Sequence, residues 1–191
     1  MARTHVALLR GVNVGGRNRV PMPVLREAVE SLGHADVVTY IQSGNVAFSA
    51  TGWVADHSAV ASALESAIAR RTGVRAVAVV LGSGDLERIV ADNPYGDPPD
   101  HRLLHAVLLP APPGEEGAAS VAAAVERARA KGSPDDACVR GRALYLLTPG
   151  GFAESVLRRE LDRGGANRTP FAEGTARNWA TILALRDLVQ G

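Results

Sequence analysis

The sequence has very little cysteine and few aromatic residues. Cys138 is its only cysteine, which excludes an internal disulfide and is compatible with a reducing compartment. Phe, Trp and Tyr together make up 4% of the chain, so aliphatic side chains must build the core. The fold therefore has to be held by aliphatic packing without a disulfide.

An excess of charge of one sign and long apolar runs are missing as well. The formal net charge is +1, which gives no global field to attract nucleic acid. No apolar run approaches the length of a membrane span, and residues 1–4 lead into a short strand without the apolar core of a signal peptide. We therefore expect a cytoplasmic protein with no membrane partner, and nucleic acid is not favoured as a partner.

The first half of the chain reads as β-α-β-β-α-β, the order of the ferredoxin-like unit. The 191 residues, 46% of them hydrophobic, can bury a full core as one large domain or two intimate halves. The run at 5–10 is uninterruptedly apolar, which is typical of a strand buried on both faces. The expected elements are strands at 5–10, 37–41, 46–48 and 76–81, a helix opened by Pro21 and Pro23, a helix capped by Asp56 or Ser58, and a trailing helix from 83 to 90.

A proline-containing loop at 93–100 is the natural boundary, and the same pattern begins again after it. We expect an α+β fold of two tandem ferredoxin-like halves, residues 1–95 and 101–191, each followed by an extra helix, with mostly antiparallel sheets. In the second half the fourth strand is at best a short one near Thr175. The other expected elements there are strands at 103–109, 137–140 and 143–147, and helices at 118–130, 152–161 and 177–189.

A loop rich in glycine and arginine, from Arg10 to Arg19, and a polar turn, from Gln42 to Asn45, form the candidate site. In a β-α-β-β-α-β unit the first strand ends at the edge where the second strand turns into the third. The topology therefore predicts that the loop and the turn share one rim of the sheet.

The residues at this rim have the chemistry to hold an anion. Glycines permit positive φ, guanidinium groups donate charge-assisted hydrogen bonds to phosphate or carboxylate, and amides and hydroxyls add neutral ones. The competing interpretation is that these residues only build turns and that the arginines are solvated. The candidate ligand-binding residues are Arg10, Asn13, Gly15, Gly16, Arg17, Asn18, Arg19, Gln42, Ser43 and Asn45.

Arg177 and Asn178 are a second candidate pair. We expect Thr175 to cap the last helix and both side chains to be exposed on its first turn. A cation at a helix N-terminus opposes the helix dipole, so Arg177 needs a partner. That partner is either an acidic residue such as Glu173, or a ligand or the loop of the other half.

Several familiar sites are excluded. The segment from Gly11 to Asn18 has the spacing of a P-loop, but Arg17 replaces its lysine and Asn18 its hydroxyl residue. The dinucleotide-binding fingerprint is absent, and the histidines lack metal-ligand spacing. The sequence therefore assigns no metal site, cofactor or catalytic set, and it does not decide whether the protein is an enzyme.

With these residues in view, the chain resembles the bacterial family called domain of unknown function 1697 (DUF1697). The resemblance spans almost the whole chain and implies a two-part α+β protein of ferredoxin-like halves in the cytosol. The segment from Arg163 to Gly174 looks longer than the family's usual connection. The matching motifs are residues 7–16, Met22 with Leu25 and Arg26, residues 39–46, and Thr175 with Arg177, Asn178 and Trp179.

Three hypotheses for function follow. The leading one is a protein that binds a small anionic ligand, a nucleotide or phosphorylated metabolite, at the rim. The second is an enzyme whose site lies between the halves and combines, for instance, Ser43 or Tyr40 with Arg177. The third is a protein or nucleic-acid interaction module, which predicts an uncovered edge strand or a basic stripe beyond the loop. Oligomeric state is not predicted.

Overall fold

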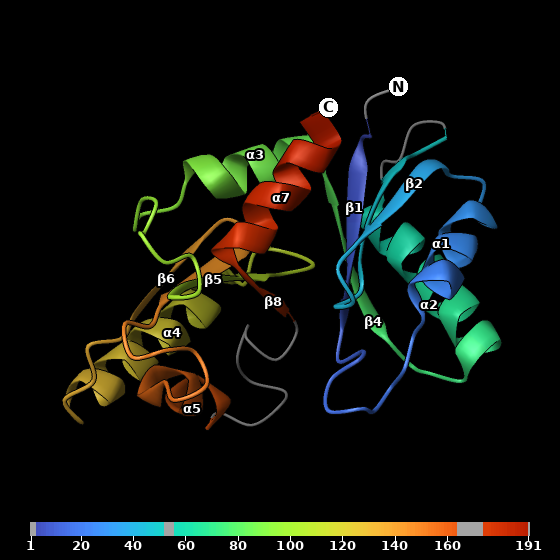
Figure 1. Ribbon diagram of the computed structural model, residues 1–191. Helices are drawn as coiled ribbons and strands as arrows, with labels where there is room; N and C mark the ends of the chain where they lie inside the picture. The colour runs from blue at the N-terminus through green and yellow to red at the C-terminus, as the bar shows by residue number, and fades with distance from the viewer. Residues whose placement is uncertain (1–2, 52–55, 164–173, 191) are drawn as a thin grey trace. The chain divides into compact units, whose positions relative to one another are not determined.

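The computed structural model describes residues 3–51, 56–163 and 174–190 (Figure 1). Most of the connection from Arg163 to Gly174, which looked long for the family, therefore lies outside the described residues. In chain order the elements are β1 (His5–Arg10), α1 (Met22–Glu30), β2 (Ala35–Tyr40), β3 (Asn45–Ser49), α2 (His57–Thr72), β4 (Val77–Gly82), α3 (Ser83–Ala91), β5 (Leu104–Leu108), α4 (Gly114–Arg129), β6 (Asp136–Arg140), β7 (Ala143–Leu147), α5 (Val156–Asp162), β8 (Thr175–Asn178) and α7 (Trp179–Gln190).

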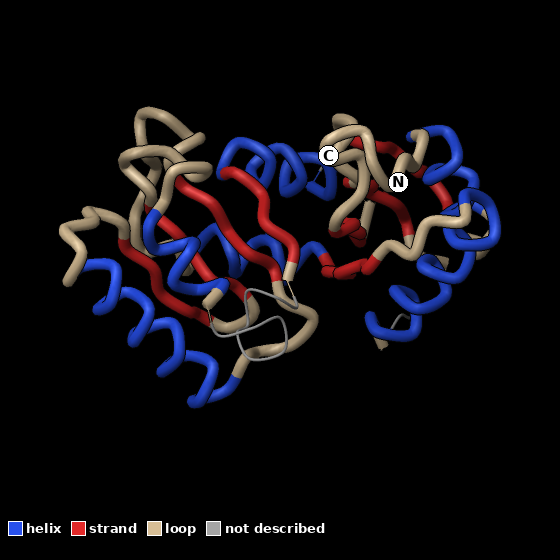
Figure 2. Tube along the Cα trace, turned by 90° about the horizontal axis from the view of Figure 1, so that it is seen from below, coloured by secondary structure: helices blue, strands red, loops and turns tan. Residues whose placement is uncertain are grey.

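The strands form two four-stranded sheets in which all neighbouring strands are antiparallel. The first sheet has the order β2-β3-β1-β4 and the second β6-β7-β5-β8. Figure 2 shows the strands of the second sheet side by side. With the β-α-β-β-α-β chain order, these are two ferredoxin-like arrangements, and the expected α+β fold is confirmed. The fourth strand of the second sheet is present, since β8 pairs with β5 from Thr175 to Asn178.

The chain divides into two compact units. The first unit is Met1–Glu87 with Ala184–Gly191, and the second is Arg88–Leu183. The divisions fall within α3 and α7. The boundaries expected from the sequence, 1–95 and 101–191, stay a prediction.

Strand β1 is buried on both faces, as its apolar run predicts. Ala7 and Leu9 belong to the core that the first sheet forms with α1 and α2. Val6 and Leu8 alternate with them and are fully buried too. The last residue of the strand, Arg10, is exposed, so β1 delivers a charged side chain to the end of its sheet.

The two units share one detail at the end of their first strands. In the first unit the Leu9 N–H donates to the Gly44 carbonyl (2.7 Å), and in the second the Leu109 N–H donates to the Arg142 carbonyl (2.9 Å). Each bond ties the strand end to the neighbouring hairpin turn. The connection that follows differs, because residues 11–20 form a loop in the first unit while prolines lead directly into α4 in the second.

Helix α5 begins at Val156 and not at Phe152 as expected. Its cap is Ser155, whose hydroxyl oxygen accepts from the Arg158 N–H (3.0 Å) and whose hydroxyl donates to a buried Asp135 carboxylate (2.8 Å). A capping serine of this kind satisfies one of the free N–H groups of the first helical turn, so the helix starts immediately after it.

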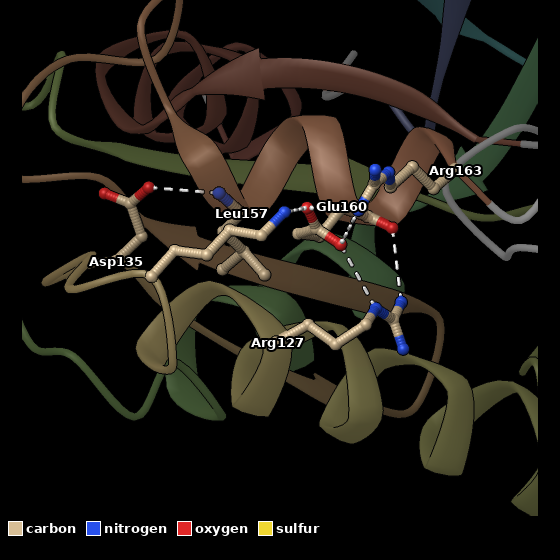
Figure 3. Close-up of polar contacts among 6 residues, drawn as sticks. Arg127, Asp135, Leu157, Glu160 and Arg163 are labelled. Atoms are coloured by element: carbon tan, nitrogen blue, oxygen red, sulfur yellow. Dashed lines mark hydrogen bonds and ion pairs between the residues drawn. The ribbon is translucent and has the colours of Figure 1, made fainter.

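A buried carboxylate, Glu160, joins α5 to α4 (Figure 3). It is 2% exposed and accepts from Arg127 (3.1 Å), from Arg163 (3.2 Å) and from Lys131. The Lys131 hydrogen bond is the main cause that lowers the pKa of Glu160 to about 2; burial opposes it, and Arg127 and Arg163 reinforce it. The charged form of Glu160 therefore contributes to the stability of the second unit.

Replacing Glu160 by Gln should make stability less sensitive to acid. The pKa of about 2 in the folded protein lies below the ordinary value of about 4.3, so the contribution is complete above that value and is lost as the pH falls toward 2. In urea unfolding, the midpoint of Glu160→Gln should lie below that of the wild type at pH 7, and the gap should narrow from about pH 5 downward. The control is Glu126→Gln, an exposed partner of Arg129, for which we expect a small gap. A difference in urea midpoint between Glu160→Gln and the wild type that stays constant as the pH falls would contradict the stabilising role of the charged Glu160 carboxylate.

Candidate functional site

Several chain segments meet at one end of the first sheet. Arg10, the last residue of β1, lies opposite Val77, the first residue of β4. Asn45, the first residue of β3, lies opposite Leu8, so the turn between β2 and β3 reaches the same end (Figure 1). We call this end the rim, and it consists of residues 10–20, 41–44 and 75–77.

The side chain of Asn13 fastens the loop to the turn. Its amide nitrogen donates to the carbonyls of Gln42 (2.8 Å) and Val20 (2.9 Å), and its oxygen accepts from the Val20 N–H (2.9 Å). The bond from Leu9 to Gly44 adds a second link. The expected adjacency of the loop and the turn is therefore confirmed.

The tip of the loop is a two-residue hairpin turn. The Arg17 N–H donates to the Val14 carbonyl (3.0 Å), and these two residues form an isolated antiparallel bridge. Between them Gly15 and Gly16 both have positive φ, 57° and 75°, as the favoured hairpin turn requires. The glycines thus set the shape of the loop.

Two more amides of the candidate set are used within the protein. Asn18 donates to the Gly11 carbonyl (3.0 Å). Asn45 is fully buried and donates to the Tyr40 carbonyl (3.2 Å) and to the Ser43 hydroxyl (3.0 Å). These side chains position the rim.

The arginines of the rim are used differently. Arg10, Arg17 and Arg19 are exposed. No described residue forms a hydrogen bond or ion pair with their side chains. The rim contains no carboxylate, and Gln42 is exposed beside the loop. The charged groups that the rim presents to solvent are therefore guanidinium groups on a pinned backbone.

The structure places Ile41 at the rim, although the sequence predicts a strand there. Ile41 was expected at the end of a strand, but β2 ends at Tyr40, and Ile41 is 53% exposed with φ of 47°. A β-branched residue in the left-handed region is strained. The preference of isoleucine for strands hid this position in the sequence.

The start of the last helix corrects another expectation. Helix α7 begins at Trp179, and the side-chain oxygen of Asn178 accepts from the Thr181 N–H (2.9 Å). Thr175 belongs to β8 and does not cap the helix. Pairing with β5 satisfies the backbone groups of this segment, which outweighs its local tendency toward a helix.

Arg177 lies in β8 of the second unit and is half-buried, not exposed on a helical turn. Its guanidinium donates to the Thr175 hydroxyl (2.7 Å) and the Ala176 carbonyl (2.8 Å). Burial lowers its pKa to about 10. Glu173, the acidic partner considered for it, lies outside the described residues.

The described part of the chain holds no grouping of metal ligands, and its one thiol is not activated. In residues 3–51, 56–163 and 174–190, no group of three His, Cys, Asp or Glu side chains is arranged to hold a metal ion. Cys138 in β6 is half-buried, and burial raises the pKa of its thiol. Over the same described ranges, every helix is too short or too polar to cross a membrane.

The fold and the rim define an α+β protein of two ferredoxin-like units, one of which carries an arginine-bearing end. The family model described as "Protein of unknown function (DUF1697)" matches residues 2–145, and the chain belongs to this family. Its structure is similar to that of the conserved bacterial protein SP0830 from Streptococcus pneumoniae, with a TM-score of 0.64, 20% identity and 99% of each chain covered. At that identity the similarity concerns the fold. No curated protein matches this sequence.

The position of Gly44 makes a sharp test of how the turn is held. A Cβ at Gly44 would lie 2.7 Å from Val12 Cγ2 and 2.8 Å from Leu9 Cβ, and its φ is +75°. Gly44→Ala should therefore lower the free energy of unfolding by about 3 kcal/mol. Gly15→Ala has positive φ but open space, and should cost about 1 kcal/mol. Equal losses in urea unfolding would contradict the close packing of the turn.

The strain at Ile41 predicts a stabilising substitution. Asn tolerates the left-handed region better than a β-branched residue, so Ile41→Asn should raise the free energy of unfolding by about 1 kcal/mol. The matched control is Val77→Asn, since Val77 is also partly exposed but lies in a strand. There Asn should lower the value by about 0.5 kcal/mol. A loss of stability in Ile41→Asn, measured by urea unfolding, would refute the strained geometry.

Proposed function

We propose that this protein binds a small anionic ligand, a nucleotide or a phosphorylated metabolite, at the rim of the first unit. The observation that carries the proposal is the group of exposed side chains of Arg10, Arg17 and Arg19, which have no protein partner among the described residues. These guanidinium groups would neutralise the ligand, and Gln42 would add a neutral hydrogen bond.

The pinned backbone supports the proposal. Asn13 and the bond from Leu9 to Gly44 hold the loop and the turn in place before any ligand arrives. A site that is already ordered loses less conformational entropy on binding. In this role Asn13, Asn18 and Asn45 act on the ligand through the shape of the rim.

The cellular setting is part of the same proposal. A single, half-buried cysteine and the lack of any helix able to cross a membrane, within the described ranges, agree with a protein that works in the cytoplasm. Nucleotides and phosphorylated metabolites are available there. The exposed arginines of the rim, and not the net charge of +1, would attract the anionic ligand.

Removing rim arginines should weaken binding. A thermal-shift screen of anionic metabolites, followed by calorimetry on the strongest, should give losses of about 1–3 kcal/mol for Arg10→Ala and for Arg17→Ala, because each removes a charge-assisted hydrogen bond. The control is Arg159→Ala, an exposed arginine of α5 in the second unit, which should leave binding unchanged. If the wild type and the Arg10→Ala/Arg17→Ala double variant respond identically, the proposal fails.

A further inference from the structure

The rim is also where apolar side chains are exposed. Among the described residues, the large hydrophobic side chains exposed to solvent are Val14 (68%), Ile41 (53%) and Val77 (38%). All three are rim residues. Scattered exposed aliphatic residues need no explanation, but all three of these lie at the same end of one sheet.

Two of these residues lie beside the link between loop and turn. Val14 follows Asn13 and Ile41 precedes Gln42, and the side chain of Asn13 is bonded to the Gln42 carbonyl. The two aliphatic side chains are therefore carried by backbone segments held against one another. Ile41, with its strained φ, is the residue directly before this contact.

The third apolar residue, Val77, lies beside a charged side chain. Val77 lies directly opposite Arg10 across the antiparallel pair of β1 and β4. Side chains of directly opposed residues stand on the same face of a sheet, with their Cβ atoms about 5 Å apart. Arg10 is thus a guanidinium with an aliphatic neighbour, and Arg75, exposed two residues before Val77, adds another positive charge.

The rim offers few groups that could recognise a polar ligand by specific hydrogen bonds or by stacking. The amides of Asn13, Asn18 and Asn45 donate to the protein itself. Residues 10–20, 41–44 and 75–77 include no aromatic ring for stacking and no carboxylate. What the rim presents is positive charge beside aliphatic surface, which is the complement of a molecule with an anionic head and an apolar chain.

We infer that the ligand of the rim is an amphiphilic anion, a phosphate or carboxylate joined to an aliphatic chain. The inference rests on the proposed function and names its ligand class. Arg10, Arg17 and Arg19 hold the anionic head, and Val14, Ile41 and Val77 cover part of the chain.

A series of alkyl phosphates tests this ligand class. Inorganic phosphate, butyl, hexyl and octyl phosphate are titrated into the full chain by calorimetry, below the concentrations at which they form micelles. Affinity should rise by about twofold per methylene, which corresponds to burying about half of each methylene. An affinity that does not change with chain length, while phosphate still binds, overturns the inference and leaves the proposed function standing.

Variants distinguish binding of the ligand's anionic head from binding of its alkyl chain. Val14→Ser with Ile41→Ser should flatten the dependence on chain length and leave the affinity for inorganic pyrophosphate within about twofold, since no charge is removed. Arg10→Ala with Arg17→Ala should weaken all members of the series by the same factor. Val24→Ser, a half-exposed valine of α1 outside the rim, is the control and should change neither. A chain-length dependence that survives in Val14→Ser/Ile41→Ser contradicts the inference.

A final arm identifies the source of the amphiphile. Co-sedimentation with phosphatidylglycerol vesicles, compared with phosphatidylcholine vesicles, shows whether the head group is recognised within a lipid surface. Binding to monomeric alkyl phosphates alone supports a free amphiphile, and binding to the anionic vesicles supports a lipid head group. If none of inorganic phosphate, pyrophosphate, alkyl phosphates and anionic vesicles binds, the inference fails. The proposed function fails with it only if the screen of anionic metabolites also gives no ligand.

Discussion

The hydrogen bonds of one side chain, Asn13, hold the candidate site together. Its amide bonds to both Gln42 and Val20, so one residue connects the loop after β1 with the turn before β3. Asn13 also has φ of 56°, a conformation that asparagine adopts more readily than most residues. Local backbone preference and long-range contact therefore favour the same residue at this position.

The rim arginines differ from the arginines of the second unit that form ion pairs or hydrogen bonds. In the second unit Arg127 and Arg163 bond to Glu160, and Arg177 donates to its own strand. In the first unit Arg10 and Arg17 extend from the rim without such partners in the described part of the chain. Paired guanidinium groups hold helices in place, while the exposed ones at the rim are solvated. The cost to stability at the rim is the left-handed φ of Ile41. Such a cost concentrates at sites selected for binding.

Sequence reasoning worked where local patterns and topology agree. The apolar run of β1 and a cap at Asp56 or Ser58 are short-range signals; the structure shows the buried strand, and the cap is Asp56. The adjacency of loop and turn needed only the chain order of a ferredoxin-like unit, since that order fixes which strand ends share an edge.

The misassigned positions depend on partners far away in sequence. The sequence predicts at best a short strand near Thr175 and places Arg177 and Asn178 on the first turn of the last helix. All of residues 175–178 instead form β8, because they pair with β5 about seventy residues earlier. The same pairing half-buries Arg177. The sequence predicts a strand residue at Ile41, because nothing local shows that its φ lies in the left-handed region. Its exposure, like that of Val14 and Val77, becomes visible only in three dimensions.

The matching bonds from Leu9 to Gly44 and from Leu109 to Arg142 have a consequence for the connection that follows each strand. Both bonds join backbone atoms, so each half closes the end of its first strand whatever side chains the following connection carries. In the second half that connection is short and contains prolines, and in the first it is an arginine-bearing hairpin. A change in the length or composition of the loop after Arg10 would therefore leave the bond that closes the end of β1 in place.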